Sequence, residues 1–170
     1  MESLRQQQGN YRYEVIIADR RNDSVGQLID QSYPEVKRIG ASAGTSLPAL
    51  RCMALDQASG QYIIVTEDHC VPSDNWLESI TKAFAIAPKG TVAVGGCVEN
   101  GVCDTALDWA TFFCEYSYFL QPVFEGTTPI LPGMNVAYRR EIFEQIDRSI
   151  LTSGFWETTL HSRLIESGGS

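Results

Sequence analysis

Hydrophobic positions along the chain fall into short compact runs that alternate with segments whose apolar residues recur at helical spacing. A short run of β-branched and apolar residues bounded by turn residues is typical of a buried parallel strand. Such runs occur at Tyr13–Ala18, Val36–Gly40, Gln61–Thr66, Thr91–Val94 and Asn135–Tyr138. The pattern therefore predicts a strand at each of these places, with Val36–Gly40 the weakest of them.

Helical spacing marks the segments between the strands. Leu47–Ser59 has apolar residues at that spacing, and Gly60 after it is a natural helix-ending residue. Trp76, Ile80 and Phe84 recur every four residues, and we expect Pro72–Asp74 to cap their helix. Further helices are predicted at Leu4–Gln8, Val25–Ser32, Leu107–Phe119, Glu141–Ile146 and Trp156–Glu166, with a proline-containing loop at Thr127–Gly133.

Strands that alternate with helices indicate βα units and hence a sheet that is mostly parallel. The length of 170 residues corresponds to about one domain, which can bury a core without disulfides. We therefore expect a single α/β domain over residues 1–170, with three layers, α/β/α, around a mostly parallel central sheet. From about Asn100 onward the pattern is less regular.

Composition narrows the class of partner. The chain has 13 Lys and Arg against 21 Asp and Glu, a formal charge of −8, which argues against nucleic acid as the partner. No apolar run is long enough to span a bilayer, and the first residues do not resemble a signal peptide. The five cysteines have irregular spacing, which indicates reduced thiols. We expect a cytoplasmic protein without a transmembrane segment.

Two predicted strands end in acidic residues. Asp19 follows the first strand, and Glu67-Asp68-His69 follows the third. Ligands of parallel sheets bind beyond the carboxyl ends of the strands, and carboxylates with an imidazole can hold a divalent cation there. The alternative interpretation is that these are solvated loop residues, with Asp68 helping to cap the next helix.

Several of these segments, in order, resemble the family 2 glycosyltransferases. Near the start, the resemblance rests on Glu14–Asp19, Arg51 and Ala58–His69. Later it rests on Leu131–Arg140, similar to the family's Gly-x-Asn-x-Ala-x-Arg-Arg stretch, and on Gly154–Leu164, similar to its Glu-Asp-x-x-Leu-x-x-Arg-Leu helix. This resemblance implies the fold called GT-A, and transfer of a sugar from a nucleotide-sugar donor to an acceptor, with inversion at the anomeric carbon.

The resemblance also implies roles for individual residues. It makes residues 1–99 the nucleotide-binding half and residues 100–170 the acceptor half. The implied roles are Asp19, Arg51 and Asp68 for the nucleotide; Glu67, Asp68 and His69 for a divalent cation, Mn²⁺ or Mg²⁺; Gly133 and Asn135 for the sugar and acceptor; and Glu157 as the catalytic base. The acceptor itself, whether sugar, lipid or protein, is not implied.

The chain departs from the family pattern at several positions. Arg20 stands where a second acid is usual, Cys52 where an asparagine is usual, and Trp156 where the first acid of the Glu-Asp pair is usual. The metal motif reads Glu-Asp-His in place of Asp-x-Asp. The strand with which the family usually begins is missing, so we expect a truncated or minimal transferase.

These departures keep a second hypothesis open, a non-catalytic or fragmentary domain of transferase fold that binds a nucleotide or a protein partner. His161, four residues after Glu157, is a third metal ligand, a residue that orients the base, or a packing histidine. Peripheral association with the inner face of the membrane and a homo-oligomer are further alternatives. A dinucleotide-binding oxidoreductase is excluded because no Gly-x-Gly-x-x-Gly follows a strand.

Overall fold

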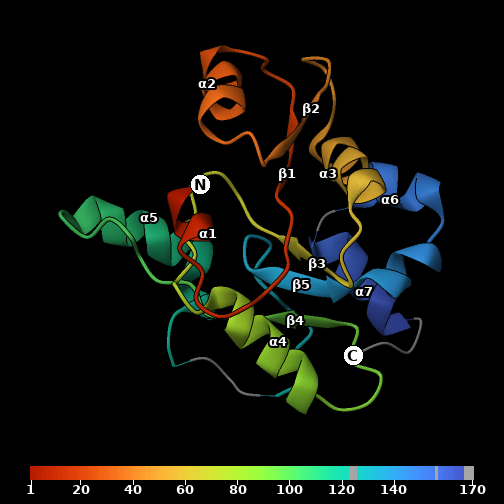
Figure 1. Ribbon diagram of the computed structural model, residues 1–170. Helices are drawn as coiled ribbons and strands as arrows, with labels where there is room; N and C mark the ends of the chain where they lie inside the picture. Colours follow the sequence, from red (N-terminus) through yellow and green to blue (C-terminus); the bar gives the residue numbers. More distant parts are fainter. Residues whose placement is uncertain (123–125, 156, 167–170) are drawn as a thin grey trace. The chain divides into compact units, whose positions relative to one another are not determined.

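The computed structural model describes residues 1–122, 126–155 and 157–166 (Figure 1). Strands and helices alternate, as the sequence predicts for an α/β protein. The elements are α1 (Glu2–Arg5), β1 (Ile16–Asp19), α2 (Ser24–Ser32), β2 (Lys37–Gly40), α3 (Leu47–Gln57), β3 (Tyr62–Val65), α4 (Trp76–Ile86), β4 (Ala93–Gly95), α5 (Ala106–Tyr116), β5 (Val136–Arg139), α6 (Arg148–Gly154) and α7 (Glu157–Glu166), with 3₁₀ turns at Ser117–Phe119 and Arg140–Glu144.

The chain forms two compact units, each assembled from separate segments. The first, the β5 unit, comprises residues 1–9, 64–138 and the chain from residue 161. The second, the β1 unit, comprises residues 10–63 and 139–160. Each unit contains segments from before and after residue 100. The division into a nucleotide-binding half, residues 1–99, and an acceptor half, residues 100–170, stays a prediction about function.

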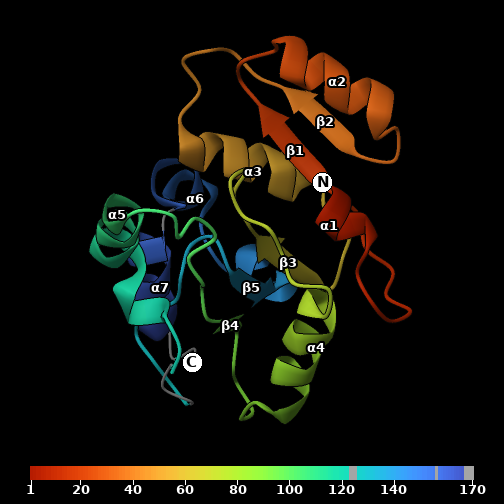
Figure 2. The ribbon, with the colours of Figure 1, turned by 90° about the vertical axis from the view of Figure 1, so that its left-hand side faces the viewer.

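The β1 unit contains a parallel pair of strands, in which β1 and β2 run in register from Ile16 opposite Lys37 to Asp19 opposite Gly40. Helix α2 connects the two strands, and α2 and α3 lie on opposite sides of the pair (Figure 2). The α2 residue Gly26 is buried, and a Cβ there would lie 2.7 Å from the Asp19 carboxylate. A side chain at position 26 would therefore have to displace the ends of the Asp19 and Arg38 side chains.

A second sheet, of three strands in the order β3–β5–β4, has β5 at its centre. Strand β4 pairs antiparallel with β5, from Ala93 opposite Tyr138 to Gly95 opposite Val136. Val136, Ala137 and Tyr138 are at most 1% exposed, so the β5 unit has its core here. Helix α4 contacts β4 and buries Leu77, Ile80 and Phe84.

The α/β class predicted from the sequence is confirmed, with a different arrangement of the strands. The strands form two sheets in place of one, and β4 and β5 are antiparallel. Periodicity reports which residues of a strand are buried but carries no information on its direction.

The local predictions differ from the structure in three places. Helix α3 ends at Gln57, where Ala58 is extended, and Gly60 has no positive φ, so the prediction that Gly60 ends the helix is wrong. The short helix predicted at Glu141–Ile146 is present as a 3₁₀ helix, Arg140–Glu144. Helix α6 was not predicted; its only signal is Asp147, whose carboxylate accepts a hydrogen bond from the backbone N–H of Ser149.

The start of α4 is capped by a residue distant in the sequence. The N-cap Asn75 makes no side-chain cap bond, contrary to the prediction that Pro72–Asp74 supplies one. Instead Gln7 Oε1 accepts from the backbone N–H of Leu77 at 3.0 Å, and Gln7 Nε2 donates to the Ser73 carbonyl at 2.7 Å. Gln7 therefore fastens the N-terminal segment to the first turn of α4.

Among the described residues, no helix has both the length and the apolar composition needed to cross a membrane.

Replacing Gln7 with Ala should destabilise the protein, because the N–H of Leu77 loses its cap. The expected decrease in the free energy of unfolding is about 1 kcal/mol, measured by urea denaturation. Gln8→Ala is the matched control, because Gln8 makes its contact to Asp74 through the backbone N–H, which alanine keeps. Equal stability of the two variants would contradict the capping role of Gln7.

Candidate functional site

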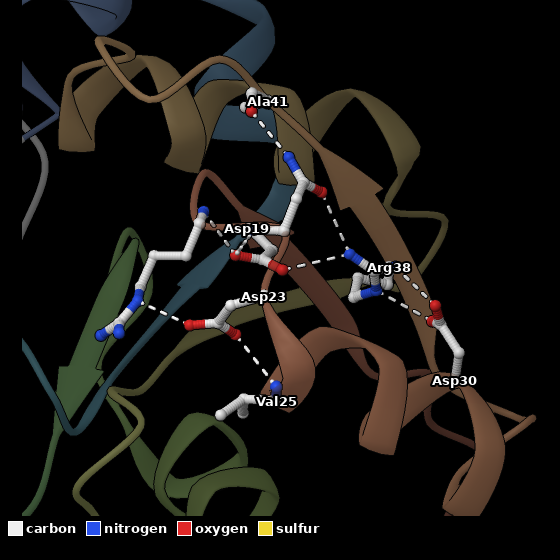
Figure 3. A network of polar contacts seen from close by, with 8 residues as sticks. Asp19, Asp23, Val25, Asp30, Arg38 and Ala41 are labelled. Atoms are coloured by element: carbon white, nitrogen blue, oxygen red, sulfur yellow. Dashed lines mark hydrogen bonds and ion pairs between the residues drawn. The ribbon is translucent and has the colours of Figure 1, made fainter.

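Asp19 ends β1 and organises the turn that follows it (Figure 3). Its Oδ1 accepts from the backbone N–H groups of Arg21, at 2.8 Å, and Asn22, at 3.3 Å, and Oδ2 accepts from Arg38 Nη1 at 3.1 Å. Asn22 has φ 48°, the left-handed conformation that asparagine tolerates in a turn. The carboxylate predicted to face a nucleotide base is thus engaged in holding the backbone of the β1–α2 turn.

Arg38 on β2 links Asp19 to α2. Its guanidinium donates to the Asp30 carboxylate from Nε at 2.9 Å and also from Nη2, and Figure 3 shows the fork between Asp19 and Asp30. The pKa of Asp19 is lowered, first by the backbone N–H of Arg21 and further by Arg38. The hydrogen bond from Arg38 also lowers the pKa of Asp30. Both acids are therefore ionised across the neutral range, and the fork neutralises much of their charge.

Arg51, the other β1-unit residue predicted to bind the nucleotide, lies on α3, which packs against β1. Its Nη1 donates to the carbonyl of Phe155 at 3.0 Å. Phe155 is only 2% exposed and its ring contacts Phe143, with centroids 5.3 Å apart. Arg51 therefore ties α3 to the end of α6, two residues before Glu157. A direct contact of Arg51 with a nucleotide stays a prediction.

Glu67, Asp68 and His69 form the turn after β3 in the β5 unit. His69 Nδ1 lies 3.7 Å from Glu67 Oε2 and 3.7 Å from Asp68 Oδ1, and the Asp68 side chain is fully exposed. The backbone N–H of Cys70 donates to the Glu67 carbonyl at 3.1 Å and closes the turn. The sequence therefore places an imidazole between two carboxylates at the carboxyl end of a strand.

The side chains of this turn are a partial set of donors for a divalent cation. Within residues 1–122, 126–155 and 157–166, no group of three His, Cys, Asp or Glu side chains is arranged to hold a metal ion by itself. Mg²⁺ bound at phosphate sites commonly takes one or two carboxylates and completes its coordination with water and phosphate oxygens. Glu67 or Asp68 would supply a carboxylate of this kind, and His69 would add an imidazole nitrogen.

Asn135, just before β5, joins three parts of the β5 unit. Its Oδ1 accepts from Trp76 Nε1 at 2.8 Å, and its Nδ2 donates to the Cys97 carbonyl at 2.9 Å. A Cβ at Gly96 would come within 2.8 Å of Asn135 Nδ2, so a side chain at position 96 would displace the Asn135 amide. Gly133, the other residue predicted for the acceptor pocket, is half-buried in the loop before β5. The acceptor role of both residues stays a prediction.

Glu157, the predicted catalytic base, is the first residue of α7, and its side chain lies outside the part of the chain that the structure describes. His161 is only 6% exposed, and its Nε2 is 2.8 Å from the hydroxyl of Tyr138. This favours the packing interpretation of His161. The sequence contained no signal for the pairing, because Tyr138 and His161 belong to separate segments.

An open hollow of about 290 Å³ lies in the β1 unit, and its lining includes none of the predicted site residues. The ion pair between Arg148 and Asp56 lies at its edge, and Arg148 Nη2 also donates to the Cys52 carbonyl at 3.1 Å. The lining residues are Leu55, Asp56, Arg140, Phe143, Glu144, Ile146, Arg148 and Leu151.

Comparisons with known proteins support the resemblance noted above. The family model described as glycosyl transferase family 2 matches residues 1–147. A similar solved structure is the mannosyltransferase PcManGT from Pyrobaculum calidifontis in complex with GDP-Man and Mn²⁺, with a TM-score of 0.56 and 18% identity. The match covers 85% of this chain and 40% of that one, so the chain spans less than half the length of its structural neighbour. No curated protein sequence matches the chain.

At that level of identity, the likeness to the mannosyltransferase concerns the fold. The chain shares the α/β architecture of a GT-A glycosyltransferase, as the sequence predicts.

The lowered pKa of Asp19 predicts a specific dependence of stability on pH. A carboxyl whose folded pKa is below its unfolded value of about 3.9 stabilises the fold above that value, and its contribution is lost as the pH falls through the folded pKa. The free energy of unfolding should therefore decrease below about pH 4, and less steeply in Asp19→Asn. Urea denaturation between pH 7 and pH 2.5 measures the difference. Asp104→Asn is the control, because Asp104 is an exposed acid without an ion pair among the described residues, and this variant should keep the pH dependence of the parent protein. The same pH dependence in Asp19→Asn as in the parent would contradict the stabilising role of the Asp19 carboxylate.

Proposed function

The chain belongs to the family 2 glycosyltransferases, and on that premise we propose that it transfers a sugar from a nucleotide-sugar donor to an acceptor hydroxyl, with inversion and with a divalent cation. The observation that carries the proposal is the family match over residues 1–147. The architecture shared with a GDP-mannose-bound mannosyltransferase supports a nucleotide-sugar donor.

The roles that the family resemblance implies are proposed for the residues of each unit separately. Asp19 and Arg51 in the β1 unit act on the nucleotide, Asp19 mainly by shaping the turn after β1. In the β5 unit, Glu67 or Asp68 together with His69 would hold the cation, which neutralises the charge of the donor diphosphate when bound. The distances of 3.7 Å from His69 Nδ1 to each carboxylate support this pairing of ligands.

Glu157 acts as the general base. Its carboxylate removes the proton of the acceptor hydroxyl as that oxygen attacks the anomeric carbon from the face opposite the leaving group. A bond forms between the acceptor oxygen and the anomeric carbon, the bond from that carbon to the diphosphate oxygen breaks, and the configuration inverts. The nucleoside diphosphate leaves with the electron pair.

Two contacts lie near Glu157 in the sequence, one within each unit. Arg51 Nη1 donates to the Phe155 carbonyl two residues before Glu157, and the Tyr138 hydroxyl lies 2.8 Å from Nε2 of His161, four residues after it. A general base contributes about 10²- to 10⁴-fold to the rate only when it lies within hydrogen-bond reach of its proton. Gly133 and Asn135 would line the acceptor pocket.

A second candidate function is a non-catalytic domain of transferase fold that binds a nucleotide or a protein partner. The observations that favour it are Arg20, Cys52 and Trp156, at positions where the family pattern has other residues. Such a domain would bind nucleotide without turnover.

Replacing Glu157 with Gln should reduce sugar transfer at least 100-fold and leave the Kd for nucleoside diphosphate unchanged, because the amide cannot accept the proton. Release of nucleoside diphosphate from a panel of nucleotide sugars, with glycan, lipid and peptide acceptors, measures turnover. Glu166→Gln, at the other end of α7, is the matched control and should retain parental turnover.

Unchanged turnover in Glu157→Gln would rule out the assigned base. Nucleotide binding without turnover by the parent chain, across the whole panel, would support the non-catalytic domain.

A further inference from the structure

Helix α5 of the β5 unit is apolar on nearly all sides, but one of its sides is open to solvent. On the inner side, Phe112 is only 6% exposed, and its ring lies 6.2 Å from Trp109 and 5.7 Å from Tyr116, measured between centroids. A helix that is apolar all round is normally covered all round. The residues of α5 that are neither aromatic, aliphatic nor cysteine are Asp108, Thr111 and Glu115.

The outer side of α5 presents a stripe of exposed residues. Leu107, Ala110 and Cys114 are exposed and follow one another at positions i, i+3 and i+7, which lie on one side of a helix. Leu107 is 73% exposed, and Tyr118, in the 3₁₀ turn that follows, is 85% exposed. We call these four residues the α5 stripe. Their spacing is the one through which an amphipathic helix is bound by a partner.

The charge beside the α5 stripe is negative and unpaired. The chain has no lysine or arginine from Gly90 to Tyr138. Asp104, just before the N-cap of α5, and Glu115, in its last turn, are exposed and form no ion pair with a described residue. An acid in the last turn of a helix also faces the negative end of the helix dipole. Both carboxylates would therefore gain from cations brought by a partner.

We propose that the α5 stripe is a docking surface for a basic amphipathic helix of a partner protein. Apolar side chains of that helix cover Leu107 and the rest of the stripe, and its lysines or arginines face Asp104 and Glu115. The inference goes beyond the proposed function and does not depend on it, because none of the residues assigned to donor, cation or acceptor belongs to the stripe.

The same charges argue against two other occupants of the α5 stripe. A second copy of the chain would bring an identical set of carboxylates, and its own α5 would offer no cation to Asp104 or Glu115. Helices that lie on membranes carry lysine and arginine on their polar face, which attract anionic lipids. A partner with positive charge beside an apolar face complements both features of the stripe.

The test uses the full chain and a synthetic helical peptide of about 14 residues, roughly four turns, made of leucine at helical spacing and lysine. Fluorescence anisotropy measures binding of the labelled peptide at about 0.15 M salt. The leucine–lysine peptide should bind, and a peptide with glutamate in place of lysine should not. Binding should weaken as the salt concentration rises, because the charges are exposed.

Two variants of the chain test the apolar and the charged part of the α5 stripe separately. Leu107→Ser should weaken binding about tenfold, the effect of leaving one leucine uncovered. Its control is Ile86→Ser, since Ile86 is 85% exposed at the end of α4, outside the stripe. Glu115→Lys should weaken binding about fivefold and reduce its salt dependence. Its control is Glu141→Lys, at an exposed acid in the β1 unit, which should keep the parental affinity.

Three results would overturn the proposal. The first is that the folded parent, checked by circular dichroism, fails to bind the leucine–lysine peptide, or that Leu107→Ser and Glu115→Lys bind it as tightly as their controls. The second is a dimer in analytical ultracentrifugation that dissociates in Leu107→Ser, which would assign the α5 stripe to a second copy. The third is binding to phosphatidylserine vesicles that is lost in Leu107→Ser, which would assign the stripe to a membrane.

Discussion

Burial of the central strand β5 is the constraint on which much of the β5 unit depends. Val136, Ala137 and Tyr138 have at most 1% of their surface exposed, so any polar group among them needs a partner inside the protein. The partner of the Tyr138 hydroxyl is Nε2 of His161, and this hydrogen bond connects α7 to the strand. Asn135, immediately before β5, bonds both Trp76 at the start of α4 and the Cys97 carbonyl after β4. The polar contacts that satisfy this strand thus also position the helices beside it.

The β1 unit is organised by paired charges. Asp19 ends β1, takes two backbone N–H groups of the following turn and binds Arg38, which in turn binds Asp30 on α2. Gly26 on α2 leaves room for this pair, since a Cβ there would lie 2.7 Å from the Asp19 carboxylate. An acid at the end of a parallel strand is therefore also a structural residue here.

The positions of most elements follow from short-range patterns. Tyr62–Val65 and Val136–Arg139 are compact apolar runs, and α4 shows its period through Ile80 and Phe84. Helix α6 was missed because seven residues without an apolar period look like a loop. The antiparallel pairing of β4 and β5 was missed because strand direction is set by tertiary contacts, which a pattern of apolar residues does not record.

For the candidate site, the sequence indicated the functional residue types but not their bonding partners. The residue types at Asp19, Glu67 and His69 were visible in the sequence, and the structure places each at the end of a strand as expected. The partners of the site residues could not be predicted from the sequence. Asp19 bonds Arg38, which is 19 residues away, and Arg51 bonds the carbonyl of Phe155, which is 104 residues away. Sequence resemblance supplied the roles of Gly133, Asn135 and Glu157, which physical reasoning on spacing alone did not provide.

The measurement that tests the account most directly is the affinity of the chain for a nucleoside diphosphate with and without Mn²⁺, by isothermal titration calorimetry. If the turn formed by Glu67, Asp68 and His69 shares a cation with the diphosphate, Mn²⁺ should tighten binding at least tenfold, because each ligand completes the coordination of the other. Binding of equal strength in the presence of a chelator would contradict that account of the donor site.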